Sequence, residues 1–493
     1  MKKSMTIGLL AIALAGGTFD RPAFSQVAAP SPDPTEIPVP PIATSSPKMP
    51  GVDDLPSRPE MPDPLTMNDG QKVTTPQQWQ QRRLEMKQIL EYYAVGQAPP
   101  PPGNVKGTEV SSQLVMDGKV KYRLVHVTFG PNESLSLDIG IFTPTTGGPF
   151  VTVISPSGSP PGATRLPHLP QGPTQGHNMD ALLPPLPSAT PSANAAPTTQ
   201  PAARGAARGP GAAPAGARGG FAGGFGGGAR TAQSIAAGSP VLAHGFAFVT
   251  FDNTDCGEDT TLRMPDGSWA FRTTRFYPAY PNYDWGLLQG WAWGVSRIVD
   301  YLETDPSIDA TKLIVTGVSR TGKSALVAGA FDDRIAMVAP VASSGGGTPA
   351  YRFSGAEHGG KEGLSEMMRK YPNWFSPHLH EFWGHADKLP FDEHWFIALA
   401  APRPFIALEG TRDQNVNFNG LRKSWEAALP AFAFLHVEDH LGVSWADRMH
   451  GLVQGDWDAL LAFADKNLLG KTVDRKFDDF PAALFPNPAV SAQ

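Results

Sequence analysis

"LIVTGVSRTGKSALVAGAF", residues 313–331, joins an apolar run to a run of small residues through a turn that contains Ser319. The apolar run predicts a strand and the small residues predict a helix, so Ser319 stands at a strand-to-helix turn. Two motifs fit this turn. From Gly317 to Ser324 it matches G-x-x-x-x-G-K-[ST], the phosphate-binding P-loop, and Gly317 with Ser319 also begins a nucleophile elbow.

The P-loop interpretation lacks its partners. It needs a hydrophobic strand that ends in Asp to hold Mg²⁺, and the strands expected here end in "ALEG" and "FLHVED". The loop 318–321 is also poor in glycine for a backbone that wraps phosphates. We therefore favour the nucleophile elbow, although Thr321 replaces the usual second glycine and Gly322 comes one position late. The first amides of the helix would stabilise an oxyanion beside the serine.

A nucleophilic serine needs an acid and a histidine base, which follow such an elbow in that order. Asp413, in "IALEGTRDQN", comes directly after an expected strand. His450, in "WADRMHGLVQGDW", lies between the last expected strand and the last helix. The chain has 12 histidines, so position rather than presence singles out His450. We interpret the rivals His436, within an expected strand, and His440, just beyond it, as structural.

The patterns around the turn predict a mostly parallel α/β sheet. Alternating apolar residues predict strands at 107–115, 119–129, 135–144 and 149–157. A strand in 238–252 should pair with the fourth of these. Helix and strand patterns then alternate up to residue 468, with an irregular excursion at 345–402 and a strand expected at 431–437. This order predicts right-handed crossovers, an antiparallel N-terminal part, and ligands at the carboxyl ends of the strands.

Composition changes along the chain divide it into regions. Lys2 and Lys3 before "MTIGLLAIALAGG" and "RPAFSQ" predict a signal peptide, hence a periplasmic or secreted protein with no membrane span in the mature chain. In "TTPQQWQQRRLEMKQILEYYAVG", Thr75 is the expected N-cap of a helix and Gly96 its stop. The expected regions are a signal peptide at 1–25, a Pro-rich linker at 26–62, a single catalytic domain at 63–471 interrupted by a low-complexity disordered insertion at about 156–237, and a C-terminal tail at 472–493.

Charge and cysteine content exclude other classes. The net charge is −6, so no general basic field attracts nucleic acid, and we expect no nucleic-acid partner. The few scattered arginines make the insertion flexible filler rather than an RNA-binding segment. The single cysteine, Cys256, excludes an intrachain disulfide.

At this point the chain resembles a known family. "GVSRTGKSALVAGAFDDRIA" looks like the signature of the glucuronoyl esterases, carbohydrate esterase family fifteen. "DWGLLQGWAWGVSRIVDYLETDPSIDATKL", "YPNWFSPHL", "LPFDEHWFIALAAPRP" and "HGLVQGDWDALLAFADKNL" support it, over about 62–155 and 238–471. The resemblance implies an α/β-hydrolase fold, a three-layer sandwich with a mostly parallel central sheet. It also implies activity on 4-O-methyl-glucuronic acid esters that join xylan to lignin.

The resemblance assigns roles to matching residues. Ser319 would be the nucleophile and His450 the general base. Arg320, directly after the serine, would donate to the oxyanion, which suits a fixed guanidinium. Lys323 would hydrogen-bond sugar hydroxyls; the alternative is a solvated helix lysine. The late glycine at 322 also belongs to the family pattern.

Two positions depart from that pattern. Many members take the triad acid from the strand after the elbow, and that place is Ala342 here. The chain resembles bacterial members whose acid follows the next strand, which implies that Asp413 orients His450. Many members also have tryptophan two residues after this acid, where Asn415 stands, so sugar stacking is weakened or moved.

Further polar residues complete the expected site. Glu362 matches a substrate-contacting acid of bacterial relatives, with Glu366 as its rival. Trp374 is expected to line the pocket, with a buried core position as the alternative. His394, in "FDEHW", lacks a third ligand at metal-binding spacing, and we interpret it as structural.

The sequence therefore predicts a monomeric serine esterase that needs no cofactor and no metal. Its expected partner is the ester between glucuronoxylan and lignin, reached through an open cleft. The alternatives are another carbohydrate esterase, such as an acetylxylan esterase, and a catalytically impaired carbohydrate-binding relative.

Overall fold

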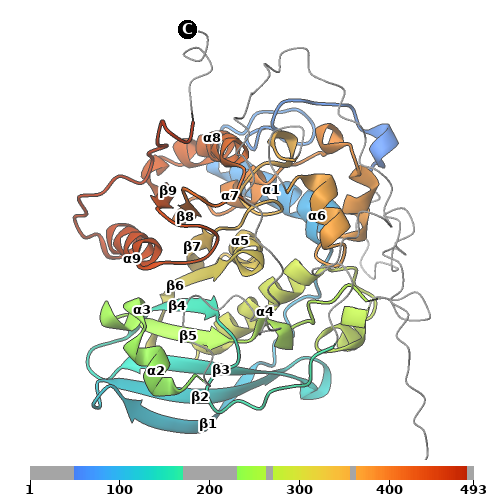
Figure 1. Ribbon diagram of the computed structural model, residues 1–493. Coiled ribbons are helices and arrows are strands. Elements are labelled where there is room, and N and C mark those ends of the chain that lie inside the picture. The colour runs from blue at the N-terminus through green and yellow to red at the C-terminus, as the bar shows by residue number, and fades with distance from the viewer. Residues whose placement is uncertain (1–48, 170–229, 263–269, 356–361, 486–493) are drawn as a thin grey trace, which may run out of the picture.

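The computed structural model describes residues 49–169, 230–262, 270–355 and 362–485 (Figure 1). The signal peptide expected at 1–25 and most of the expected insertion lie outside these ranges. Within them, no helix combines the length and the apolar character needed to cross a bilayer.

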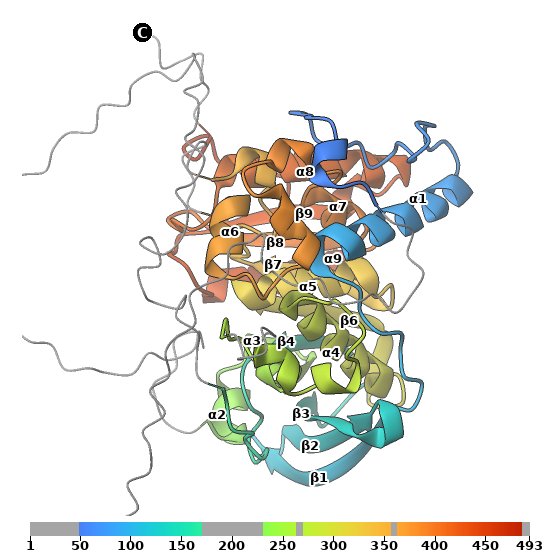
Figure 2. The same ribbon diagram turned by 90° about the vertical axis from the view of Figure 1, so that its right-hand side faces the viewer.

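One sheet forms the centre of the domain. Its strand order is β1-β2-β3-β5-β4-β6-β7-β8-β9, which runs from bottom to top in Figure 1 and Figure 2. The strands are β1 (Lys106–Val115), β2 (Val120–Phe129), β3 (Leu135–Pro144), β4 (Phe150–Pro156), β5 (Ala247–Phe251), β6 (Ile308–Val318), β7 (Ile335–Val341), β8 (Phe405–Gly410) and β9 (Leu441–Ala446). The first three strands and the β3–β5 pair are antiparallel, and every pair from β5 to β9 is parallel. The predicted mostly parallel sheet is confirmed.

The two segments that flank the insertion pair directly. β4 and β5 run parallel, with Thr152 opposite Ala247 and Val153 opposite Phe248. β5 is buried along its whole length and β4 at residues 151–154, which explains their mostly apolar sequences. The insertion therefore leaves and re-enters the sheet at neighbouring strands.

Helices cover both faces of the sheet and make three layers. One core contains residues of α1 (Pro76–Ile89), α4 (Leu287–Leu302), α5 (Arg320–Phe331), α6 (Leu364–Lys370), α7 (His394–Ala398) and α8 (Phe418–Phe434), and the other contains residues of α2 (Ala232–Ala237), α3 (Pro240–Ala243) and α9 (Gln454–Leu469). Side chains along β6 alternate between them, since Leu313 and Val315 face the first core and Ile314 the second. Figure 1 shows α9 and α4 on opposite sides of the sheet.

The first helix begins and ends as the sequence predicts. The Thr75 hydroxyl accepts from the Gln78 amide at 3.2 Å, and the Gln78 side chain accepts from the Thr75 amide at 3.1 Å, a capping box. The helix continues through a short π-helical segment, Leu90–Val95, to Gly96. The φ of Gly96 is 79°, a value that glycine adopts without strain.

The strand predicted at 431–437 is wrong. The preceding helix α8 continues through Pro430 to Phe434, and the strand that follows is β9, at Leu441–Ala446. Ala428, Ala431 and Phe432 recur at helical spacing and are buried, so packing outweighs the local cost of the proline. The sequence reading missed this because a short apolar run fits a strand as well as a buried helix face.

The described end of the Pro-rich linker expected at 26–62 packs against the domain. Where the structure describes it, its carbonyls accept hydrogen bonds from the domain: Tyr93 Oη donates to Pro50 at 2.6 Å and Trp395 Nε1 to Pro62 at 3.0 Å. Prolines lack an amide donor but keep their carbonyl acceptors. Buried tryptophan and tyrosine side chains use those acceptors, which fixes the segment to the domain.

The described part of the tail expected at 472–493 also packs against the domain. Phe477 is buried in the second core, and its carbonyl accepts from the Val443 amide at 2.6 Å. At the other boundary, the last residues of the insertion expected at about 156–237 form the capped helix α2. The helix segment has one large apolar residue, Ile235, and the tail carries its apolar residues without a helical or strand period, so the sequence pattern alone does not reveal that they pack.

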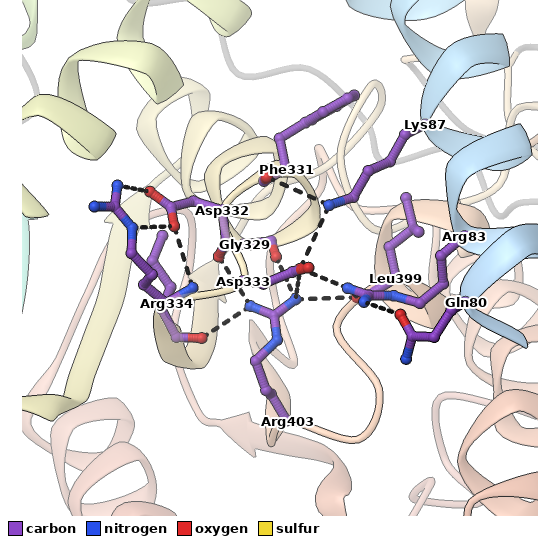
Figure 3. A network of polar contacts seen from close by, with 11 residues as sticks. Gln80, Arg83, Lys87, Gly329, Phe331, Asp332, Asp333, Arg334, Leu399 and Arg403 are labelled. Carbon is purple, nitrogen blue, oxygen red and sulfur yellow. Dashed lines mark hydrogen bonds and ion pairs between the residues drawn. The ribbon is translucent and has the colours of Figure 1, made fainter. Parts of the chain in front are cut away.

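A polar network fixes α1 to the end of α5 (Figure 3). Asp333 Oδ1 accepts from Arg83 Nη2 at 2.5 Å and from Lys87 Nζ at 3.4 Å. Arg403 reaches the same oxygen at 3.4 Å and also donates to the carbonyl of Gly329 at 2.7 Å. Burial alone would raise the pKa of Asp333, but these cations lower it below its ordinary value. One carboxylate thus joins three segments that lie far apart in the sequence.

Candidate active site

Ser319 occupies a strained turn between β6 and α5. Its φ is 58° and its ψ is −120°, a combination that L-residues rarely adopt. Its amide donates to the Val341 carbonyl of the neighbouring strand at 2.9 Å, which fixes the turn to the sheet. Strain at a non-glycine residue that the surrounding structure holds in place is typical of functional positions.

The structure explains why the second glycine comes one position late. A Cβ on Gly322 would lie 2.9 Å from the carbonyl oxygens of both Gly317 and Val341, so only glycine fits there. A Cβ on Gly317 would lie 2.4 Å from the Thr321 carbonyl. The Thr321 hydroxyl in turn accepts from the Val318 amide at 2.9 Å and closes the turn. This chain therefore needs its glycine at 322, and the Thr321 side chain stabilises the turn through its hydrogen bond to the Val318 amide.

The structure brings Asp413 and His450 together. His450 Nδ1 lies 2.7 Å from Asp413 Oδ2, while the other oxygen of Asp413 accepts from the Asn415 amide at 2.9 Å. The rival His440 contacts the Pro402 carbonyl at 2.6 Å instead, and His436 lies in the turn after α8, with a φ of 59°. Of these three histidines, His450 has the contact to a carboxylate that a general base requires.

Short main-chain contacts hold the loops that carry this pair. The Thr411 amide donates to Ala446 at 2.9 Å and the Arg412 amide to Arg448 at 3.1 Å. A Cβ on Gly410 would lie 2.6 Å from the Arg448 carbonyl, so the close approach requires glycine. The buried Arg448 guanidinium also donates twice to Asp456 of α9, at 2.7 and 3.0 Å. The loops after β8 and β9 therefore form one rigid unit.

Electrostatics keep Asp413 ionised. Its side chain is buried, which alone would raise its pKa, but the bonds from His450 and the Asn415 amide lower that pKa below its ordinary value. Glu409, four residues earlier and within β8, behaves oppositely. Burial, with the nearby charge of Asp413, raises the pKa of Glu409 to about 8. At neutral pH the Asp413 carboxyl is therefore ionised, while the neighbouring Glu409 carboxyl is mostly neutral.

Arg320 lies among aromatic rings. Its guanidinium carbon is 5.3 Å from the ring centroid of Trp374 and 5.9 Å from that of Tyr371. These two rings stack on each other at 3.9 Å with an interplanar angle of 7°. Trp374 is 2% exposed, so it has the buried core position expected as the alternative, and its ring packs against the Arg320 guanidinium. Arg320 also pairs with Asp259, a residue that the sequence reading did not single out.

Lys323 is buried rather than solvated. Its ammonium donates to the Ser343 carbonyl and to the Ser344 hydroxyl, the latter at 3.1 Å. Burial lowers the pKa of Lys323, although nearby Glu362 opposes this. The alternative of a solvated helix lysine is wrong. In a P-loop the corresponding lysine ammonium binds phosphates, whereas here the Lys323 ammonium donates to Ser343 and Ser344.

Glu362 lies beside Lys323. Its Oε2 accepts from the Ser344 hydroxyl at 2.6 Å, so serine bridges the carboxylate and the ammonium. The rival Glu366 is in α6, one turn further along the chain. At the end of β7, Ala342 is fully buried with a φ of 46°, and it offers no acid to His450. Another buried acid, Glu393, lies near Lys323, and burial next to Asp392 raises its pKa.

His394 has a structural position. Its Nε2 lies 2.7 Å from the Pro62 carbonyl, and burial lowers its pKa to about 4. In the part of the chain that the structure describes, no group of three or more His, Cys, Asp or Glu side chains is arranged to hold a metal ion.

The candidate residues share one edge of the sheet. Ser319 follows β6, Asp413 follows β8, His450 follows β9, and Asp259 follows β5. These strands are parallel, so their carboxyl ends meet at the same edge, where ligands bind in open α/β sheets.

Comparisons with known proteins identify this arrangement. A family profile described as "Glucuronyl esterase, fungi" matches residues 229–435. A carbohydrate esterase from an unknown prokaryotic organism is 27% identical over 83% of this chain and 90% of its own length. A 4-O-methyl-glucuronoyl methylesterase of Podospora anserina is 28% identical over 89% of this chain and 75% of its own length.

The fold agrees with these matches. The solved structure of a carbohydrate esterase family 15 glucuronoyl esterase from Caldicellulosiruptor kristjansonii superposes with a TM-score of 0.59. It is 27% identical and covers 85% of this chain and 93% of its own. Profile, relatives and fold agree with the elbow, so the P-loop interpretation is set aside. Profile, relatives and solved structures all support carbohydrate esterase family fifteen, the glucuronoyl esterases, and the chain is a carboxylic ester hydrolase with the α/β-hydrolase fold.

Proposed function

We propose that the chain is an exported serine esterase that cleaves esters between (4-O-methyl-)glucuronic acid of glucuronoxylan and lignin alcohols through an acyl-enzyme. The observation that carries this proposal is the His450–Asp413 pair, at 2.7 Å, at the sheet edge where the strained turn presents Ser319. The matches to glucuronoyl esterases support the choice of a glucuronoyl ester.

The reaction then follows the serine triad. The Ser319 hydroxyl attacks the ester carbonyl while His450 takes its proton at Nε2, because Nδ1 faces Asp413. The tetrahedral intermediate collapses when the bond to the alcohol oxygen breaks and His450 returns the proton to that oxygen. Water adds to the acyl-enzyme by the same steps in reverse order and releases the uronic acid and free Ser319.

Cationic groups near the turn suit this substrate. Arg320 and the first amides of α5 would stabilise the oxyanion, since the first turn of a helix has no internal acceptors for its amides. The product is a uronate anion, which the Arg320 and Lys323 charges also favour. Lys323, Ser344 and Glu362 form a donor and acceptor set that suits sugar hydroxyls.

Substrate comparison tests the proposal. We expect benzyl glucuronate to be hydrolysed with a higher kcat/KM than acetylated xylan or aryl acetates. A preference for acetates would favour an acetylxylan esterase. No turnover of either class, in wild type and in S319A alike, would favour the carbohydrate-binding relative and contradict the enzyme.

A further inference from the structure

The loop that joins β5 to α4 brings a carboxylate against the arginine that follows the nucleophile. Asp259 Oδ2 pairs with Arg320 Nη1, and the two side chains are 10% and 26% exposed. The pair links positions 61 residues apart in the sequence. Because it lies at the edge of the site and is partly shielded from water, it is stronger than an ordinary surface ion pair.

Both carboxylate oxygens of Asp259 are engaged. While Oδ2 takes the arginine, Oδ1 accepts from Trp374 Nε1 at 2.9 Å. The guanidinium therefore lies beside the stacked rings of Trp374 and Tyr371 with its orientation set from two sides. An arginine side chain otherwise has many rotamers, and fixing it before the reaction removes that entropy from the barrier.

The next residue along braces the loop on its other side. Glu258 is 5% exposed and pairs with Arg275, which also donates to the Thr254 carbonyl at 3.2 Å and to the Pro167 carbonyl at 2.9 Å. The two adjacent carboxylates thus have different partners, since Glu258 pairs with Arg275 and Asp259 pairs with Arg320. A loop held in this way can hold an arginine in turn.

We propose that Asp259 is a positioning residue for ester hydrolysis, which acts through Arg320 by directing its guanidinium at the oxyanion. The inference rests on the proposed function, because it requires Arg320 to contact the transition state. The ion pair engages Nη1, and the guanidinium keeps further N–H donors for the substrate. A carboxylate that served only to balance charge would weaken the arginine, so its removal would raise the rate instead.

The test uses D259A and D259N in the full chain, with benzyl glucuronate as substrate. We expect D259A to lower kcat by about 10–100-fold with little change in KM, because an oxyanion donor acts in the transition state. D259N keeps one oxygen acceptor in place of two, so it can accept from Arg320 or from Trp374 but not from both as the carboxylate does, and it should recover only part of the loss. In an R320A background, D259A should cause no further loss.

A matched control separates positioning from folding. Asp305 forms an ion pair with Arg123 at 2% and 13% exposure, on elements that carry none of the candidate site residues. D305N should lower the unfolding midpoint and leave kcat unchanged.

Three outcomes would overturn the role: an unchanged or raised kcat in D259A, an equal further loss in the R320A background, or a matching loss of kcat in D305N. If wild type fails to turn over benzyl glucuronate better than S319A, the proposed function fails. The effect of D259A is then measured on whichever ester the wild type cleaves.

Discussion

Asp413 Oδ2 lies 2.7 Å from Nδ1 of His450, across 37 positions of sequence, while Ala342 occupies the place where many family members carry their triad acid. The acid that we propose for the triad therefore follows β8 rather than β7. The loops after β8 and β9 contact each other through main-chain hydrogen bonds, so the acid and the base belong to one rigid unit.

This arrangement predicts that Asp413 is indispensable. D413N should lower kcat by on the order of 10³–10⁴-fold, because an amide no longer fixes the imidazole tautomer or stabilises the imidazolium. The unfolding midpoint should change little, since an amide can keep the contact to the Asn415 amide. Near-normal turnover in D413N would assign the acid to another carboxyl, and Glu409 would be the next to replace.

Glu409 predicts a pH dependence of stability. Its pKa is raised from 4.5 to about 8, chiefly by burial, so the folded state keeps a proton that the unfolded state loses. The stability that the protonated Glu409 contributes is fully present below the unfolded pKa of 4.5 and is lost as pH rises to about 8. The Gln side chain of E409Q stays neutral at every pH. The free energy of unfolding of E409Q relative to wild type should therefore increase by roughly 1–4 kcal/mol as pH rises across this window. Urea unfolding at pH 5 and pH 8.5 measures it, and a constant difference would contradict the raised pKa.

The strained backbone at Ser319 predicts that a glycine at this position stabilises the protein, although the variant is inactive. With a φ of 58° the serine is strained, and glycine adopts this conformation freely. S319G should therefore be more stable than S319A by about 1 kcal/mol, after the larger chain entropy of glycine is subtracted. Thermal unfolding of the two inactive variants makes the comparison. Equal midpoints would mean that the turn stores no strain.

The network around Asp333 predicts a structural effect without a catalytic one. D333A leaves Arg83, Lys87 and Arg403 without their shared carboxylate (Figure 3), and should lower the free energy of unfolding by about 1–3 kcal/mol. High salt should shrink this difference, because screening weakens the partly exposed pair. A loss of kcat at temperatures where the variant stays folded would show that the network reaches the site.

Local chemistry made much of the fold predictable. The turn at Gly317–Ser319, the Thr75 cap and the alternating strands all depend on neighbours within a few residues, and the structure has them where the sequence places them. The strand predicted at 431–437 failed because burial of one helix face, which sequence does not display, outweighs Pro430. The packed ends of the linker and the tail were missed for the same reason.

The candidate site also contains residues that local sequence position identifies and residues that only tertiary packing reveals. Ser319, Asp413 and His450 are marked by their places after strands, and the sheet brings those places together. Asp259 carries no such mark, because its loop has no motif and its partner is far away in the sequence. The burial of Lys323 was also beyond sequence reasoning, since its neighbours Ser343 and Ser344 lie on a different strand end.

The central claim is that Ser319 is the nucleophile of a glucuronoyl ester hydrolase. The most direct measurement is the turnover of benzyl glucuronate by wild type and by S319A at matched concentration and confirmed folding. We predict clear hydrolysis by wild type and a fall to near-background in S319A, on the order of 10⁴–10⁶-fold. Equal rates in the two proteins would contradict the account.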